Sequence, residues 1–381
     1  MMRLLNTIKT TDCGLFFSSL ILSIIGLVSI YSTTYKANSS FFIKQSVWVV
    51  LALTLFFVFS SIDYRFFKAH FLPVLLLYFG GILLLFLVDL FGTQVRGAQS
   101  WLSVGPINIE PVELLKIIFI LILAKYFSQR HVEIYKLKHI IISGLYLLLP
   151  SIFIIMQPDI GSFLILFFIW VGIIIISGIK MKHFLVLGLV AIILMVCIWS
   201  FVLEGYQKNR ILTFLNPELD PYGAGYNSIQ VLITVGSGGL WGNGIFHGTQ
   251  SQLGFLPEAH TDFIYAAIVE ELGILIGVLI LVFYSFIFFK MLKIVRRTGD
   301  NFAKLITIGT SILFISQVGL NIGMTLGLTP ITGLTLPLIS YGGSSLLVMY
   351  ISLGILNSVH RNSTESVAIG AKDLTKAGEL A

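Results

Sequence analysis

The stretch GLFFSSLILSIIGLVSIYSTT, residues 14–34, contains no charged side chain. A helix of about 20 apolar residues crosses the hydrocarbon core of a membrane, so this stretch predicts a membrane span. Similar stretches recur along the chain. They lie near residues 14–34, 43–62, 71–92, 111–127, 138–156, 160–178, 183–203, 263–289, 305–327 and 337–359. The sequence therefore predicts an all-α integral membrane protein with about ten transmembrane helices.

The composition agrees with a membrane protein and excludes a soluble one. Of the 381 residues, 56% are hydrophobic and 11% are charged, and the mean hydropathy is +0.96. A soluble domain has no interior large enough to bury that much apolar surface. The formal net charge of +6 comes from basic residues in short loops between apolar runs, so we expect no nucleic-acid partner. Cys13 and Cys197 form no zinc-binding motif, and we expect neither a disulfide nor a structural metal.

The distribution of Lys and Arg predicts the orientation. With a cytoplasmic amino terminus, the cytoplasmic loops hold most basic residues, including the cluster between residues 290 and 304. The opposite loops hold only Lys36, Lys44, Arg96, Lys208 and Arg210. The positive-inside rule therefore places both termini in the cytoplasm.

The chain is predicted to form one membrane domain, residues 1–361, followed by a polar and disordered tail, residues 362–381. Two outer segments are too long for simple turns: residues 93–110, and the loop between the seventh and eighth helices, about 204–262. The middle of this loop is expected to dip into the membrane as a short re-entrant helix packed on the bundle. Its glycine-rich run, residues 236–244, lacks the Lys-Ser/Thr ending of a nucleotide-binding loop and predicts a mobile loop over a cavity.

Ionisable side chains at the outer ends of the spans are the candidate functional residues, because charges in a membrane are expensive. Glu113 and Lys116 lie three residues apart on one face of the fourth predicted helix. Asp159 follows a proline in an outer turn, Arg210 lies in the long outer loop, and Asp262 stands at the start of the eighth helix. These groups share one membrane depth, which predicts an outward-facing polar cavity.

Each of these residues also has a structural interpretation. Asp262 would act as a helix cap, and Glu113 with Lys116 as an ion pair that fixes helix packing. Asp159 would be turn chemistry, and Arg210 an anchor for lipid headgroups. The residues alone leave these alternatives open. Glu270 and Glu271, deeper in the eighth helix, receive no role.

The segment that begins at Asn321 and continues as GLTPITGLTLPLISYGGSS, residues 327–345, resembles the signature of a known family. The chain is similar over nearly its whole length to the shape, elongation, division and sporulation (SEDS) polymerases. Four stretches favour the RodA branch over the FtsW branch. They are GAGY at 223–226, HGTQSQL at 247–253, FLPE at 255–258 and HTDF at 260–263. The chain departs from the family at Ser100, where an Arg is common before Trp101, and at 110–113, which read Glu-Pro-Val-Glu instead of Gln-Pro-Ser-Glu.

The resemblance implies a peptidoglycan glycosyltransferase that polymerises lipid II at the outer face of the bacterial cytoplasmic (inner) membrane during cell elongation. In this reaction the 4-hydroxyl of an N-acetylglucosamine on lipid II attacks the anomeric carbon of a strand held on undecaprenyl pyrophosphate. The resemblance implies Asp262 as the base, with Glu113 and Lys116 ordering the cavity. Lys116 or Arg210 would face phosphate.

Further site residues and partners follow from the same resemblance. Trp101 and His260 are expected to line the cavity, and a divalent cation, Mg²⁺ or Mn²⁺, is expected near Asp159, with no organic cofactor. A class B penicillin-binding protein and other elongation-complex proteins are the expected partners, docking on the outer ends of the eighth and ninth helices. A lipid II flippase and a non-catalytic scaffold are the alternatives. Because the ionisable groups gather at one outer edge and not at the midplane, surface chemistry is favoured over transport.

Overall fold

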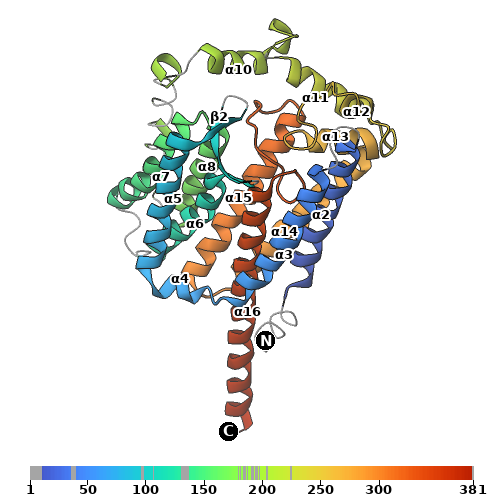
Figure 1. Cartoon of the computed structure of the whole chain (residues 1–381). Coiled ribbons are helices and arrows are strands. Elements are labelled where there is room, and N and C mark those ends of the chain that lie inside the picture. Colours follow the sequence, from blue (N-terminus) through green and yellow to red (C-terminus); the bar gives the residue numbers. More distant parts are fainter. Residues whose placement is uncertain are drawn as a thin grey trace.

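The computed structural model describes residues 11–35, 40–95, 98–105, 107–129, 137–178, 180, 182, 186, 188–189, 193, 196, 198–202, 205–223 and 225–379. It is an all-α bundle with one small sheet (Figure 1). Seven helices within the described residues are long and apolar enough to cross a membrane. They are α2 (Cys13–Thr34), α3 (Ser40–Ser61), α5 (Phe71–Phe91), α7 (Leu137–Met156), α14 (Ile274–Arg297), α15 (Asn301–Thr325) and the first part of α16 (Gly343–Glu379). The predicted fold class is confirmed, whereas the count of ten spans is not. The predicted span 183–203 lies largely outside the described residues.

Helix α6 (Pro111–Ser128) forms the centre of the bundle. It packs against α5, α15, α16 and the shorter apolar helix α8 (Ile160–Ile176). Nearly every side chain of α6 is therefore buried, including its charged residues Glu113, Lys116 and Lys125. Pro111 starts the helix at a position where its missing N–H has no partner to lose. Because α6 is central, the helix face that carries Glu113 and Lys116 lies in the protein interior.

The eighth predicted helix, 263–289, is broken into α13 (Ile264–Leu272) and α14. The break lies at Gly273, whose φ of 87° favours glycine. A Cβ at this position would collide with the carbonyl oxygen of Leu240. The hydropathy of the sequence continues through the break, which is why the sequence predicted one helix. The last predicted helix, 337–359, likewise begins only at Gly343.

The two long outer segments are structured. Residues 93–109 form an antiparallel sheet of β1 (Thr93–Val95), β2 (Ala98–Val104) and β3 (Ile107–Ile109) in the order β1-β2-β3. The second segment contains α10 (Gly205–Leu215), η2 (Pro217–Leu219), α11 (Tyr226–Ser237) and α12 (Thr249–Gln252), and η1 (Ile198–Val202) precedes it in the predicted span 183–203. Helices α10, α11 and α12 cover one end of the bundle, and both termini lie at the other (Figure 1). Helix α11 packs on α13 and α15, as expected for the middle of this loop, and its depth in the membrane stays a prediction.

The glycine-rich run 236–244 is anchored through its backbone although most of its residues are exposed, and its mobility over a cavity stays a prediction. Its backbone bonds to the α13–α14 junction through Asn243 N to Glu270 O (2.9 Å) and Gly244 N to Glu271 O (2.9 Å). A Cβ at Gly238 or Gly242 would collide with the backbone of α13. The glycines therefore permit close approach of two backbones.

The carboxyl-terminal helix joins the start of the chain at the end opposite α10. The amide N–H of Asp12, which caps α2, donates to Asn357 Oδ1 of α16 at 3.0 Å. Lys290 Nζ of α14 binds the Asp12 carboxylate at 2.9 Å. Beyond this contact α16 continues as a helix to Glu379 and projects from the bundle (Figure 1). The predicted disorder of the tail stays a prediction. The short helix α4 (Arg65–Ala69) connects α3 and α5 at the same end.

Candidate functional site

The first turns of α6 carry a buried ion pair. Lys116 Nζ donates to Glu113 Oε1 at 2.7 Å, and the two side chains are 0% and 4% exposed. The spacing of three residues places both on one helix face, as the sequence predicted. The second carboxylate oxygen of Glu113 is buried without a hydrogen-bond partner in the described part of the chain. A buried acceptor of this kind is uncommon in native proteins and is available to a donor from water or substrate.

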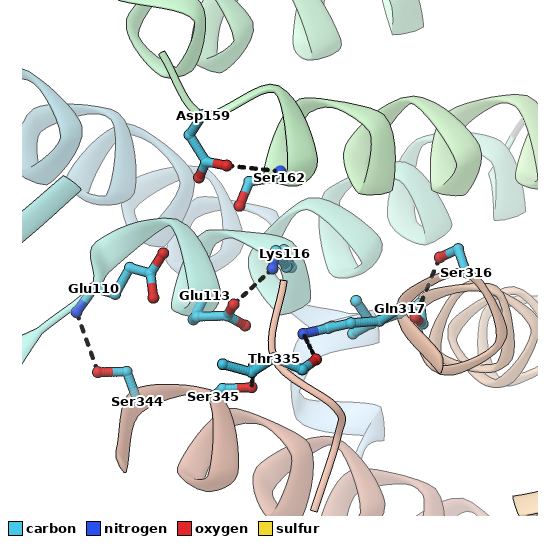
Figure 2. A network of polar contacts seen from close by, with 11 residues as sticks. Glu110, Glu113, Lys116, Asp159, Ser162, Ser316, Gln317, Thr335, Ser344 and Ser345 are labelled. Atoms are coloured by element: carbon cyan, nitrogen blue, oxygen red, sulfur yellow. Dashed lines mark hydrogen bonds and ion pairs between the residues drawn. The ribbon is translucent and has the colours of Figure 1, made fainter. Parts of the chain in front are cut away.

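Glu110, directly before α6, adds a carboxyl group that the sequence reasoning missed. Its backbone N–H donates to Ser344 Oγ of α16 at 3.1 Å. In Figure 2 its side chain lies beside Glu113, between Asp159 of the α8 turn and the first turn of α16. The available signal was the departure from the family pattern at this position, to which no role was assigned.

The electrostatics of Glu110 define the extent of the site. Withdrawal from solvent raises the pKa of its carboxyl well above the usual range, and the negative charges of Glu113, Asp159 and Asp262 raise it further, while Lys116 lowers it. All five groups are therefore close enough to interact, although they come from three separate parts of the chain. Glu113, Lys116, Asp159 and Asp262 thus all lie within electrostatic range of Glu110, and their shared substrate cavity stays a prediction. The five groups comprise four carboxyls and one ammonium, so the site has an excess of negative charge when all are ionised.

Asp262 lies just before α13 and is partly buried. The N-cap position of α13 is Phe263, so Asp262 stands directly before the helix, and its helix-cap interpretation stays open. A Cβ built on Gly333 would lie 3.7 Å from Asp262 Oδ2, which places the carboxylate against the signature segment 327–345.

Asp159 does have the turn role that the sequence left open. Its Oδ1 accepts from the amide of Ser162 at 3.0 Å and caps α8 (Figure 2). The first turn of α8 packs against the signature segment, because a Cβ on Gly161 would lie 2.9 Å from the carbonyl oxygen of Thr332. Asp159 and Asp262 therefore flank the same stretch of backbone.

The other predicted site residues contribute differently. His260 packs at a tilt against Phe41 (4.8 Å between ring centroids) and Tyr341 (5.8 Å), and its place in the cavity stays a prediction. Trp101 lies in β2, where its backbone pairs with Thr93. Arg210 lies in α10, and its side chain is outside the described residues.

Glu270 and Glu271, left without a role by the sequence, hold the outer segment on α13. Glu270 accepts from the amides of Gln250 (2.7 Å) and Ser251 (3.0 Å) and so caps α12. Glu271 Oε1 accepts from Ser32 Oγ (2.7 Å) and Gln252 Nε2 (2.9 Å). Both carboxylates are buried, and their hydrogen bonds offset the free-energy cost of removing them from water. They are structural residues.

A bundle of membrane-spanning helices with a buried ion pair and further carboxyl groups gathered near one end defines a polytopic membrane protein with a polar site at one face. Residues 13–365 match the FtsW/RodA/SpoVE family model, described as "Cell cycle protein". The chain belongs to this family.

Relatives in the family have curated functions. Peptidoglycan glycosyltransferase MrdB of Escherichia coli is 40% identical over 285 residues, covering 74% of this chain and 76% of the relative. Stage V sporulation protein E of Bacillus subtilis is 34% identical over 369 residues, 94% of this chain and 100% of the relative. Among solved structures, rod shape determining protein RodA of Thermus thermophilus superposes with a TM-score of 0.68 at 28% identity, covering 93% of this chain and 97% of that one. A chain from a structure described as "Structural coordination of polymerization and crosslinking by a peptidoglycan synthase complex" has a TM-score of 0.80 at 30% identity, covering 93% of this chain and 98% of that chain.

Proposed function

We propose that this protein is a peptidoglycan glycosyltransferase that polymerises lipid II during cell elongation. The observation that carries the proposal is the placement of Asp262 Oδ2 against the signature segment, with Asp262 and the buried Glu113–Lys116 pair both acting on the charge of Glu110. The names of the relatives MrdB and RodA support the activity and the elongation role. The polymerase would lie in the bacterial cytoplasmic membrane with the α10–α12 end outside and both termini in the cytoplasm, as the positive-inside rule predicts.

In the proposed reaction Asp262 is the general base. Its carboxylate takes the proton of the 4-hydroxyl of lipid II while that oxygen bonds to the anomeric carbon of the donor strand. The bond from the anomeric carbon to the pyrophosphate oxygen breaks, and the leaving group takes the electron pair. Lys116 is already paired with Glu113 and fully buried, so we assign it to ordering α6. Arg210 remains the candidate for contact with the pyrophosphate.

A divalent cation would offset the negative charge of the site and of the pyrophosphate. The described residues contain no group of three His, Cys, Asp or Glu that would enclose a metal. Mg²⁺ commonly uses one or two carboxylates together with phosphate oxygens and water, so a single carboxylate such as Asp159 fits an ion shared with substrate.

Asp159→Asn separates the cation role from the turn role. Asparagine caps helices as well as aspartate, so the bond to Ser162 is retained while the charge is lost. We expect this variant to fold normally and to need a higher concentration of Mg²⁺ or Mn²⁺ after chelation with EDTA. An unchanged metal requirement would leave Asp159 with its turn role alone.

A class B penicillin-binding protein is the proposed partner. The described structure has an apolar cavity of about 320 Å³ between α14 and α15, with Leu281 and Ile315 at its exposed edges. A cavity of this volume accepts side chains and not a whole helix, so we propose that a membrane helix of the transpeptidase packs over it and places apolar side chains inside. The solved structure whose title joins polymerization to crosslinking supports this partner class. We expect Ile315→Trp to weaken co-purification with the transpeptidase, and Leu148→Trp on the exposed face of α7 to leave it unchanged.

The polymerase reaction is tested by reconstitution with the matching class B penicillin-binding protein, lipid II and Mn²⁺ or Mg²⁺. Wild-type protein should produce glycan ladders on a gel, and Asp262→Ala should lower the rate at least about 10²-fold, the usual contribution of a general base. Absence of ladders from wild type, together with lipid II flipping in vesicles, would refute the polymerase and favour a flippase. Full activity of Asp262→Ala would refute the assigned base. If cells that lack the protein lose their shape, while the purified protein shows neither polymerase nor flippase activity, the scaffold would be favoured.

A further inference from the structure

The backbone at His260, Thr261 and Asp262 is held by hydrogen bonds from residues between 321 and 345. The carbonyl of His260 accepts from Tyr341 N at 2.9 Å. The carbonyl of Thr261 accepts from Ser340 Oγ at 2.6 Å, and that of Asp262 from Asn321 Nδ2 at 2.9 Å. Three consecutive carbonyls are therefore fixed, and the bond nearest the carboxylate comes from Asn321.

Asn321 links Asp262 to the backbone on which its carboxylate lies. Its side chain is fully buried in α15, and Nδ2 donates a second bond to the carbonyl of Leu334 at 2.6 Å. An amide NH₂ carries two hydrogens, so both are used. Leu334 directly follows Gly333, the residue that faces Asp262 Oδ2. One side-chain nitrogen thus sets the separation between the main chain of Asp262 and the segment beside its carboxylate.

The orientation of this amide follows from its partners. If it were flipped, Oδ1 would face two carbonyl oxygens, which repel it. In the observed orientation Oδ1 is buried without a hydrogen-bond partner among the described residues. Leaving a buried acceptor unpaired costs about 1–3 kcal/mol. An apolar side chain would avoid that cost but would take this donor away from the carbonyls of Asp262 and Leu334, so the value of the amide lies in the two bonds it makes.

We propose that Asn321 is a positioning residue for Asp262: its side-chain amide holds the Asp262 carbonyl and the Leu334 carbonyl together, so that the carboxylate stays in the geometry required for proton transfer. This proposal rests on the proposed polymerase function. It assigns Asn321 no contact with substrate. The effect therefore falls on the chemical step and not on substrate binding.

Gln317 provides a matched control. It lies one turn earlier on α15, is equally buried and also has an unpaired amide oxygen in the described structure. Its Nε2 donates to the carbonyl of Thr335 at 3.4 Å (Figure 2), so it reaches the same segment without touching Asp262. Gln317→Leu therefore shows how much kcat and stability change when a buried amide of this helix is removed while the Asn321–Asp262 contact is kept.

The test compares wild type, Asn321→Leu, Asn321→Asp and Gln317→Leu in the glycan-ladder assay with lipid II and the partner transpeptidase. We expect both Asn321 variants to lower kcat about 10²-fold with little change in KM, because a displacement of about 1 Å at a reacting group has that effect. Gln317→Leu should retain kcat within a few-fold. Thermal unfolding in detergent, measured on the same samples, gives the folded fraction used to normalise each rate.

Asn321→Asp keeps the shape of the side chain and adds a second readout. The introduced carboxyl can donate to one carbonyl only when protonated. The kcat of Asn321→Asp relative to wild type at the same pH should therefore rise as pH falls, whereas the relative kcat of Asn321→Leu should stay constant. Equal normalised kcat for Asn321→Leu and Gln317→Leu would overturn the positioning role, as would a rise in KM at constant kcat. If Asn321→Leu does not fold, the isosteric Asn321→Asp decides the test. A kcat equal to that of wild type at every pH would then overturn the positioning role. If the wild-type protein itself is inactive, the result would instead refute the proposed polymerase function.

Discussion

Replacing Lys116 by methionine tests whether the buried ion pair is stable only as a pair. Its partner Glu113 is 4% exposed and 2.7 Å away, so the substitution leaves a carboxylate without its cation in the protein interior. Breaking a buried pair by removing one partner costs about 3–5 kcal/mol. Replacing both partners by apolar residues of similar volume is often neutral or stabilising. We therefore expect Lys116→Met to lose about 3–5 kcal/mol and the double variant with Glu113→Leu to recover most of that loss.

The assay is equilibrium unfolding in detergent micelles, followed by tryptophan fluorescence at fixed pH. Lys68→Met is the control, because it breaks a pair of similar length (2.8 Å to Asp300) whose side chains are 50% and 22% exposed. Exposed pairs contribute about 0–1 kcal/mol and are screened by salt, whereas the buried pair should be insensitive to salt. A loss for Lys116→Met no larger than that for Lys68→Met would refute the reasoning. A double variant that adds the two single losses would refute it as well.

Three further predictions follow from the structure. Glu110→Gln should remove the pH dependence of KM. The pKa of the Glu110 carboxyl is raised, so the wild-type site gains this negative charge only as pH rises through the raised value. KM for the anionic lipid substrate should therefore increase over that pH range in wild type and stay constant in the variant. Gly273→Ala should destabilise the protein by more than about 2 kcal/mol in the unfolding assay, because strain at a φ of 87° adds to a collision with a carbonyl; Gly178→Ala, with a φ of 97° and open space around it, should show the strain alone. Glu270→Gln should increase the rate of hydrogen exchange at residues 248–252 about tenfold, because one amide oxygen replaces a charged carboxylate that accepts two backbone bonds. The control Glu218→Gln, at an exposed position, should leave exchange at these residues unchanged.

The membrane fold was largely predictable because its signal is local. A run of about 20 apolar residues has one low-energy arrangement in a membrane, whatever lies elsewhere in the chain. The same hydropathy concealed the break at Gly273, since a glycine within an apolar run carries no signal of the backbone that packs against it. The sheet at 93–109 was also missed because its strands are short.

Part of the site was also predictable. Glu113 and Lys116 pair through helix periodicity, which depends only on their spacing. Asp159 was correctly left with a turn interpretation as well, because a carboxylate before a helix caps it by local geometry. Glu110 escaped notice, since its importance depends on charges that approach it from α8 and from the turn before α13.

By itself, the sequence determined that this chain spans a membrane with a charged pair at the end of one helix, because helix formation, hydropathy and side-chain spacing are local properties. Only the tertiary structure decided that Asp262 lies against Gly333 and that donors 59 and 79 residues away hold its turn in place. These hydrogen bonds join backbone carbonyls to side chains across the bundle. Such bonds have no periodicity along the chain, and their partners are chosen only when the helices pack.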